Sequence, residues 1–130
     1  MKHKFIFITI SFFLIAFFIA YYAVYKNHRN IANEQASFIL AADSFYEEFI
    51  ENPTVSTKKY LDKTIQLSGV ITEIDMGNFM IDDKVIFYAD DSIVHTLEMG
   101  KFITVKGRSI GYDELLENPK IDQTTLITVQ

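Results

Sequence analysis

The sequence comprises 130 residues with a net charge of −5, 49% hydrophobic residues and no cysteine. This length allows one globular domain of about 100 residues beside a terminal segment, and it excludes a multidomain enzyme. The first 30 residues hold four basic residues and no acidic one, which leaves 8 basic and 17 acidic residues, a net charge of −9, for residues 31–130. Such an acidic domain disfavours nucleic acid as a partner, because that affinity comes mainly from Lys and Arg side chains that neutralise phosphates.

Residues 1–30 are predicted to form a transmembrane anchor with basic flanks. An uncharged run of 21 residues, Phe5–Tyr25, follows Lys2 and Lys4. A helix of that length spans about 31 Å, close to the ~30 Å hydrocarbon core of a bilayer. We therefore expect the lipid bilayer to be a partner through residues 5–25. A cleaved secretory signal is the alternative, but the run is longer than usual and lacks a small-x-small cleavage site. A buried core helix is the third reading.

The orientation of this anchor is predicted from its flanking charges. Lys2 and Lys4 precede the apolar run, and Lys26 and Arg29 follow it, so the positive-inside comparison is nearly balanced. A short basic head followed at once by an apolar run is typical of an export signal. We expect a single-pass membrane protein with its N-terminus in the cytoplasm and its domain outside.

Residues 31–62 are predicted to form an amphipathic helix and a linker. Apolar residues recur at three-and-four spacing between Ile31 and Ile50, opposite an acidic face. They are Phe38, Ile39, Ala42, Phe45, Tyr46, Phe49 and Ile50. Asn52-Pro53 is expected to end the helix, since the residue before proline avoids helical angles. The aromatic stripe is interpreted as core rather than as a cofactor site.

Residues 63–130 change to a hydrophobic period of two, which predicts five strands. The first strand, Lys63–Ile74, shifts phase beside Gly69, where we expect a bulge. The other strands are expected at Phe79–Ile81, Lys84–Ala89, Lys101–Ile110 with a bend at Gly107, and Thr124–Val129. Between them we expect turns at 75–78 and Asp82-Asp83, a helical stretch within 90–100 and a polar loop over Gly111–Ile121.

This order of elements predicts a mainly β fold. A long, glycine-bent first strand and a helical insert between the third and fourth strands are typical of a five-stranded OB-fold barrel. The amphipathic helix and the transmembrane helix would precede it. An open five-stranded sheet crossed by the helix is the alternative, but barrel closure protects the strand edges.

Short motifs in the domain support the same fold. They are Glu51-Asn52, Tyr60-Leu61-Asp62-Lys63, Leu67-Ser68-Gly69-Val70-Ile71, the run Gly100–Gly107, and Gly111. In these positions the chain resembles the bacterial tRNA_anti-like OB-fold domains, from about Ala41 to its end. The resemblance implies the OB fold and kinship with anticodon-binding domains, whereas membrane-anchored members are mostly of unknown role. Some members carry cysteines near the strand ends, and this chain has none.

The candidate ligand-binding residues follow from the fold. OB-folds bind ligands on the face of their second and third strands and on the adjoining loops. On this basis we predict Phe79, Tyr88, Arg108 and Tyr112 as ligand-binding residues. Alternation along the strands places about half of such residues in the core instead.

No catalytic, metal or cofactor site is predicted. His3, His28 and His95 lack a paired-ligand spacing, and the Asp82-Asp83 and Asp90-Asp91 pairs are typical of turns. The carboxylates at 113, 114 and 117 lie in a polar loop without the apolar pocket that raises a catalytic pKa. We therefore expect no enzyme activity.

Three functions are compatible with these observations. The first is an extracytoplasmic binding domain for an envelope protein, a peptide or a small ligand. The second is a nucleic-acid-binding protein that faces the cytoplasm, which the charge disfavours. The third is a cofactor carrier like the anchored OB-fold haem chaperones, but that family needs a histidine after its last strand and this chain has none after His95. We favour the binding domain.

Overall fold

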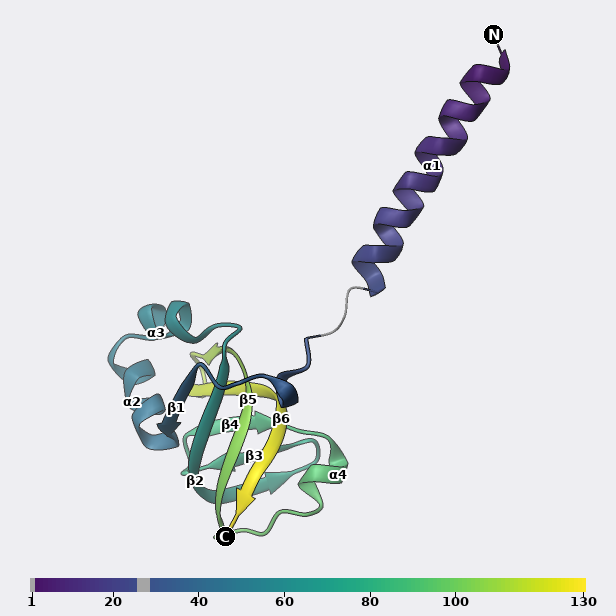
Figure 1. The fold of residues 1–130 in the computed structure, drawn as a ribbon. Coiled ribbons are helices and arrows are strands. Elements are labelled where there is room, and N and C mark those ends of the chain that lie inside the picture. The colour runs from purple at the N-terminus through teal and green to yellow at the C-terminus, as the bar shows by residue number, and fades with distance from the viewer. Residues whose placement is uncertain (1, 26–28) are drawn as a thin grey trace.

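The computed structural model describes residues 2–25 and 29–130 (Figure 1). Helix α1 (Lys2–Tyr25) contains the predicted membrane segment. Within the described residues, one helix is long and apolar enough to cross a bilayer, and its side chains are not buried against the rest of the chain. The anchor prediction therefore has the helix it requires.

Residues 29–37, which we call the strap, directly precede the first strand of the domain. It contains a short 3-10 helix, η1 (Ile31–Asn33), whose Ile31 is buried against the barrel. Strand β1 (Phe38–Ala41) follows and pairs in parallel with the next strand, β2 (Thr64–Asp75). Helices α2 (Ala42–Glu51) and α3 (Pro53–Tyr60) form the crossover that two parallel neighbours require.

The single helix predicted over Ile31–Ile50 is therefore correct only from Ala42 onward. In β1 the side chains alternate between half-buried Phe38 and Leu40 and exposed Ile39 and Ala41. Four apolar residues satisfy a period of two as easily as the three-and-four spacing that continues into α2. These four residues form a strand because β2 lies beside them and pairs with their backbone.

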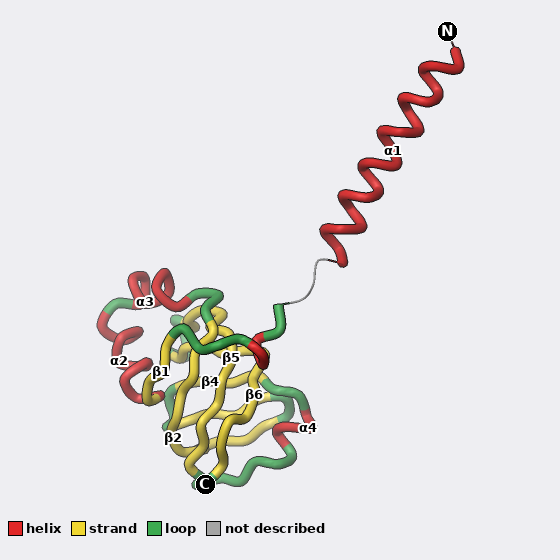
Figure 2. Tube along the Cα trace, viewed as in Figure 1, coloured by secondary structure: helices red, strands yellow, loops and turns green. Residues whose placement is uncertain are grey.

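Five strands close into a barrel. After β2 come β3 (Asn78–Ile81), β4 (Val85–Tyr88), β5 (Phe102–Asp113) and β6 (Asn118–Val129), with the short helix α4 (Asp91–Val94) between β4 and β5. The strand order is β2-β3-β4-β6-β5, and β5 pairs again with β2. The strands thus curve round on themselves (Figure 2). β4 and β6 are parallel and the other neighbours within the barrel are antiparallel. The predicted OB-fold is confirmed, with β1 added on the outside of β2.

The polar loop predicted over Gly111–Ile121 is shorter in the structure. β5 continues to Asp113, which pairs with Asn118 at the start of β6, so the turn contains residues 114–117. The predicted fifth strand therefore begins at Asn118 rather than at Thr124. Three register shifts bend this hairpin around the barrel, and they obscure the simple alternation that the prediction used.

The two predicted glycine irregularities have different outcomes. Gly107 lies at a register shift between β5 and β6, as predicted. In β2 the shift lies between Ile71 and Glu73, so the bulge predicted at Gly69 is wrong in position. A Cβ at Gly69 would lie 2.4 Å from side-chain atoms of Ile81 and Asp82, so close approach of the β3–β4 turn explains this glycine.

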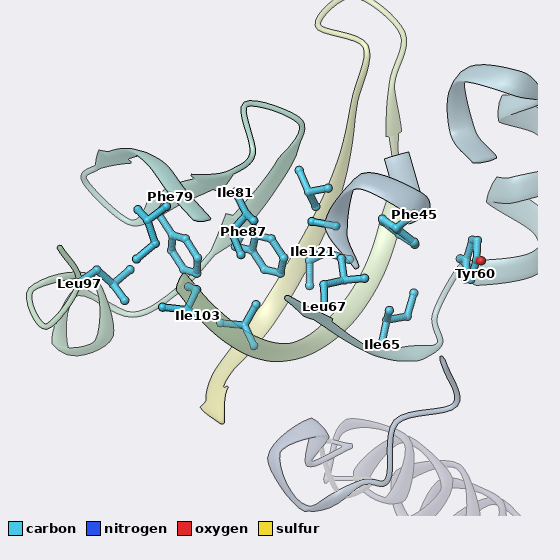
Figure 3. Packing of buried hydrophobic residues seen from close by; sticks show 14 of the residues in the cluster. Phe45, Tyr60, Ile65, Leu67, Phe79, Ile81, Phe87, Leu97, Ile103 and Ile121 are labelled. Atoms are coloured by element: carbon cyan, nitrogen blue, oxygen red, sulfur yellow. The ribbon is translucent and has the colours of Figure 1, made fainter. Parts of the chain in front are cut away.

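The hydrophobic core runs through the barrel from one end to the other (Figure 3). Leu97, from the segment after α4, covers the end near Phe79 and Ile103. At the other end Phe45 from α2 packs edge-on against Tyr60, with ring centroids 4.9 Å apart. The Tyr60 hydroxyl donates a hydrogen bond to Glu48 Oε2 at 2.8 Å, so the aromatic cluster also satisfies its polar group.

We predict that Gly107→Ala destabilises the barrel. A Cβ at this position would lie 2.4 Å from Ile121 Cγ2 and 2.7 Å from the Asp122 carbonyl oxygen, which cannot rotate away. Overpacking of this kind costs about 1–3 kcal/mol. Urea unfolding of the detergent-solubilised chain measures the free energy of unfolding. Thr104→Ala, at a half-buried position of the same strand, is the control. Equal stability of the two variants would contradict the close packing described here.

Candidate ligand-binding site

The outer face of β3 and β4 is the surface that OB-folds use for ligands. Residues directly paired across strands project from the same side of a sheet. The register places two rows of side chains on this outer face: Asp75, Asn78 and Tyr88 in one, and Glu73, Met80, Ile86 and Lys120 in the other.

The charges on this face are mainly negative. Lys120 is the one basic residue in the two rows, and its Nζ lies 2.8 Å from Asp113 Oδ2. The hydrogen bond to Asp113 raises the pKa of Lys120, and the same contact lowers the pKa of Asp113. Glu73 and Asp75 remain as exposed carboxylates at one side. The face therefore offers little positive charge to a phosphate backbone.

A cleft of about 450 Å³ opens at the end of this face beside Tyr88. Its walls come from the strap, the β2–β3 turn, the end of β4 and the middle of β6. The lining residues are Asn30, Ile31, Ala32, Gly77, Tyr88, Ala89, Asp90, Gln123, Thr124 and Thr125. Tyr88 is 38% exposed, and its carbonyl oxygen accepts a hydrogen bond of 2.8 Å from Thr124 Oγ1. The cleft thus combines an aromatic ring, hydroxyl and amide groups and the Asp90 carboxylate.

Charged groups hold the strap in place as one wall of the cleft. Arg29 donates two hydrogen bonds to the carboxylate of Glu34, at 2.6 and 2.9 Å, and one to the carbonyl oxygen of Asp62 at 2.5 Å. Thr64 Oγ1 donates to Glu34 Oε2 at 2.6 Å. Lys106 Nζ donates to the carbonyl oxygens of Ala32 and Glu34, both at 2.8 Å. These bonds, first with Arg29 and then with Thr64, lower the pKa of Glu34 from 4.5 to about 2.

The structure brings one of the four predicted ligand-binding residues, Tyr88, to this site. Phe79 is fully buried and stacks on Phe87 with centroids 5.2 Å apart, so the prediction that it contacts a ligand is corrected to a role in the core. Phe79 pairs with Ile74 and Phe87, whose side chains point into the barrel. A strand of four residues is too short for its alternation alone to show which side chains point inward.

Arg108 and Tyr112 lie away from the cleft. Arg108 forms an ion pair of 2.7 Å with Asp122 and lies 3.7 Å from Asp62, so its charge is compensated within the barrel. Tyr112 stacks on Phe49 with centroids 5.5 Å apart, and burial raises the pKa of its hydroxyl. Both predictions placed these residues beside the ligand-binding face expected of an OB-fold.

No pattern in the sequence marks two walls of the cleft. The strap residues 30–32 lie against the barrel because the strap binds Asp62, Thr64 and Lys106, which are far away in the sequence. Gln123 adopts a positive φ of 49° beside the irregular pairing of β5 and β6, and this conformation has no sequence marker such as glycine.

No metal centre is present among the described residues, because no three His, Asp or Glu side chains are grouped to share an ion. Asp82, one of the aspartates at the predicted turns, accepts a hydrogen bond of 2.9 Å from the amide of Val70. Its carboxylate therefore has a structural partner in the barrel.

Fold and face together define an OB-fold domain behind an N-terminal apolar helix. The chain belongs to the tRNA_anti-like family, which matches residues 1–121. It is similar in structure to a lipoprotein from Klebsiella pneumoniae subsp. pneumoniae MGH 78578 whose name gives a proposed nucleic acid-binding role. The two share 19% identity and a TM-score of 0.60 over 75% of this chain and 95% of the lipoprotein chain, which establishes the shared fold. No curated protein sequence matches the chain significantly.

We predict that the Glu34 carboxyl titrates near pH 2 rather than 4.5. A depressed pKa means that Glu34 stabilises the strap above pH 4.5 and that this contribution is lost as the pH falls through about 2. Carbon-detected NMR of the side-chain carboxyl measures the pKa directly. Arg29→Gln should return it toward the ordinary value, and a wild-type pKa near 4.5 would show that the strap is free in solution.

Proposed function

We propose that this protein is a single-pass membrane protein whose OB-fold barrel binds a positively charged segment of a protein or peptide outside the cytoplasm. The binding site is the cleft beside Tyr88 together with the outer face of β3 and β4. The proposed role is binding and not catalysis. Helix α1 holds the barrel at the bilayer.

The charge of the β3–β4 face carries this proposal. Single-stranded nucleic acids bind OB-folds through aromatic platforms within a basic groove. Here Tyr88 supplies an aromatic ring, but the Lys120 charge beside it is compensated by Asp113 at 2.8 Å. A groove without free positive charge would bind a polyanion weakly, and its affinity would lack the usual contribution of released counterions.

The carboxylates near the cleft favour a cationic ligand. Asp90 lines the cleft and makes no capping hydrogen bond to α4, so its charge is available. Asp75 lies in the same row as Tyr88, with Asn78 between them. Lys and Arg side chains could lie along Tyr88 while their charges meet these two carboxylates.

Nucleic acid remains the alternative ligand. The similar lipoprotein is named for a proposed nucleic acid-binding role, and the shared fold makes that role a candidate here as well. The two candidates differ in the sign of the ligand charge, so one binding experiment separates them.

We predict that the full chain in lipid nanodiscs binds a fluorescent Lys/Arg-rich peptide more tightly than single-stranded DNA or tRNA of similar length. Asp75→Asn and Asp90→Asn should each weaken peptide binding by up to about fivefold, since an exposed ion pair contributes at most ~1 kcal/mol. Fluorescence anisotropy at two salt concentrations measures both affinities, and the peptide affinity should fall at high salt.

Glu51→Gln is the matched control for these variants. It removes an exposed carboxylate at the end of α2 and changes the net charge by the same amount. Equal loss in all three variants would mean that net charge rather than the cleft attracts the peptide. Tighter binding of DNA or tRNA than of the peptide would replace this proposal with the nucleic-acid function.

The extracytoplasmic orientation has its own test, which the absence of cysteine makes simple. Met99→Cys introduces a thiol at a position that is 66% exposed. We predict that a membrane-impermeant maleimide labels it in intact spheroplasts. Val105→Cys, at a fully buried position, should stay unlabelled in the folded protein. Labelling of Met99→Cys only after lysis would place the barrel in the cytoplasm.

A further inference from the structure

Exposed apolar side chains gather where the β5–β6 turn lies beside α3. Leu115 and Leu116 in the turn are 95% and 62% exposed, and Leu61 and Ile110 are 48% and 38% exposed. We call these four residues the apolar patch. Leu61 and Ile110 line a common cleft of about 460 Å³ between α3 and β5, which also includes Glu114, the residue before Leu115. Leu115 and Leu116 directly follow Glu114 in the chain, so all four side chains lie at or beside this cleft.

This patch lies next to the point where the strap joins the barrel. Arg29 donates a hydrogen bond of 2.5 Å to the carbonyl oxygen of Asp62, which directly follows Leu61. The amide of Asp62 in turn donates to Ser109, the residue before Ile110, at 2.8 Å. In Figures 1 and 2 the strap, α3 and the turn that joins β5 to β6 lie at the same end of the barrel, and the C-terminus lies at the opposite end.

The short connection to α1 keeps this end of the barrel near the bilayer. Helix α1 ends at Tyr25, and four residue steps lead to Arg29. Even a fully extended chain spans at most about 14 Å over four residues. Because Arg29 is bound to Asp62, the start of the patch cannot be far from the membrane surface when α1 spans the bilayer.

We propose that the apolar patch rests on the surface of the bilayer that holds α1. The leucines of the turn would contact the boundary between head groups and acyl chains, where apolar side chains gain from leaving water. Lys58 and Lys63 flank the patch and are exposed, so they can meet anionic head groups. Glu114 and Glu117 are exposed in the same turn and limit the contact to a shallow one.

This second contact would fix the orientation of the barrel. The strap alone attaches the barrel at one point and leaves it free to rotate about the connection. With the patch on the bilayer, the end that carries Met99 and the C-terminus faces away from the membrane. The inference rests on the insertion of α1 proposed above, and it holds whichever side of the membrane the barrel occupies.

Single-tryptophan variants test this inference, because the chain has no tryptophan of its own. Leu116→Trp places a probe in the patch, Met99→Trp places one at the far end, and Phe13→Trp reports on α1. Each full-length variant is reconstituted into vesicles of phosphatidylcholine and phosphatidylglycerol, because anionic head groups attract basic segments. Quenching by lipids brominated along the acyl chain is then measured.

We expect strong quenching of Phe13→Trp, partial quenching with a blue-shifted emission of Leu116→Trp, and no quenching of Met99→Trp. Quenching of Phe13→Trp without quenching of Leu116→Trp would overturn the patch contact and leave the anchor intact. No quenching of Phe13→Trp would overturn the anchor itself. Quenching of both barrel probes would overturn the proposed orientation. Leu115→Trp repeats the test at the most exposed position, in case Leu116→Trp fails to fold.

Discussion

Strand β2 pairs with three other strands, β1 and β3 along one edge and β5 along the other. Its twelve residues are long enough to serve both halves of the fold, because the register shift between Ile71 and Glu73 turns its end toward β3. The pairing with β5 closes the barrel and encloses the core. It also places Thr64 and Asp62 where the strap can bind them. The strap, the cleft beside Tyr88 and the apolar patch all depend on the pairing of β2 with β5.

Much of the barrel could be predicted from the sequence because its strands alternate locally. The change of period after Asp62 located β2 to β4, and Gly107 marked a real irregularity. What the sequence could not supply was pairing between distant segments. β1 is a strand because β2 lies beside it, and its four residues fit a helical spacing equally well. The end of β5 and the start of β6 are polar segments that form strands because they pair with each other.

The candidate site was predictable only in part for the same reason. Tyr88 was found because the OB-fold places its third strand on the ligand-binding face. Arg108 and Tyr112 were expected beside the same face, but the structure engages them elsewhere, in an ion pair with Asp122 and a stack on Phe49. The strap residues that complete the cleft are held by Arg29, Glu34 and Lys106, whose partners lie up to 74 residues away in the chain.

The separation of the paired residues also sets an order of assembly. The antiparallel neighbours β2, β3 and β4 are joined by short turns, whereas the β2–β5 ladder joins residues between 32 and 44 positions apart, from Val70 with Phe102 to Thr64 with Arg108. Loop-closure entropy opposes such pairing more than it opposes a hairpin, so non-local ladders form slowly. A chain that emerges with α1 first therefore keeps one edge of β2 open until β5 has been synthesised.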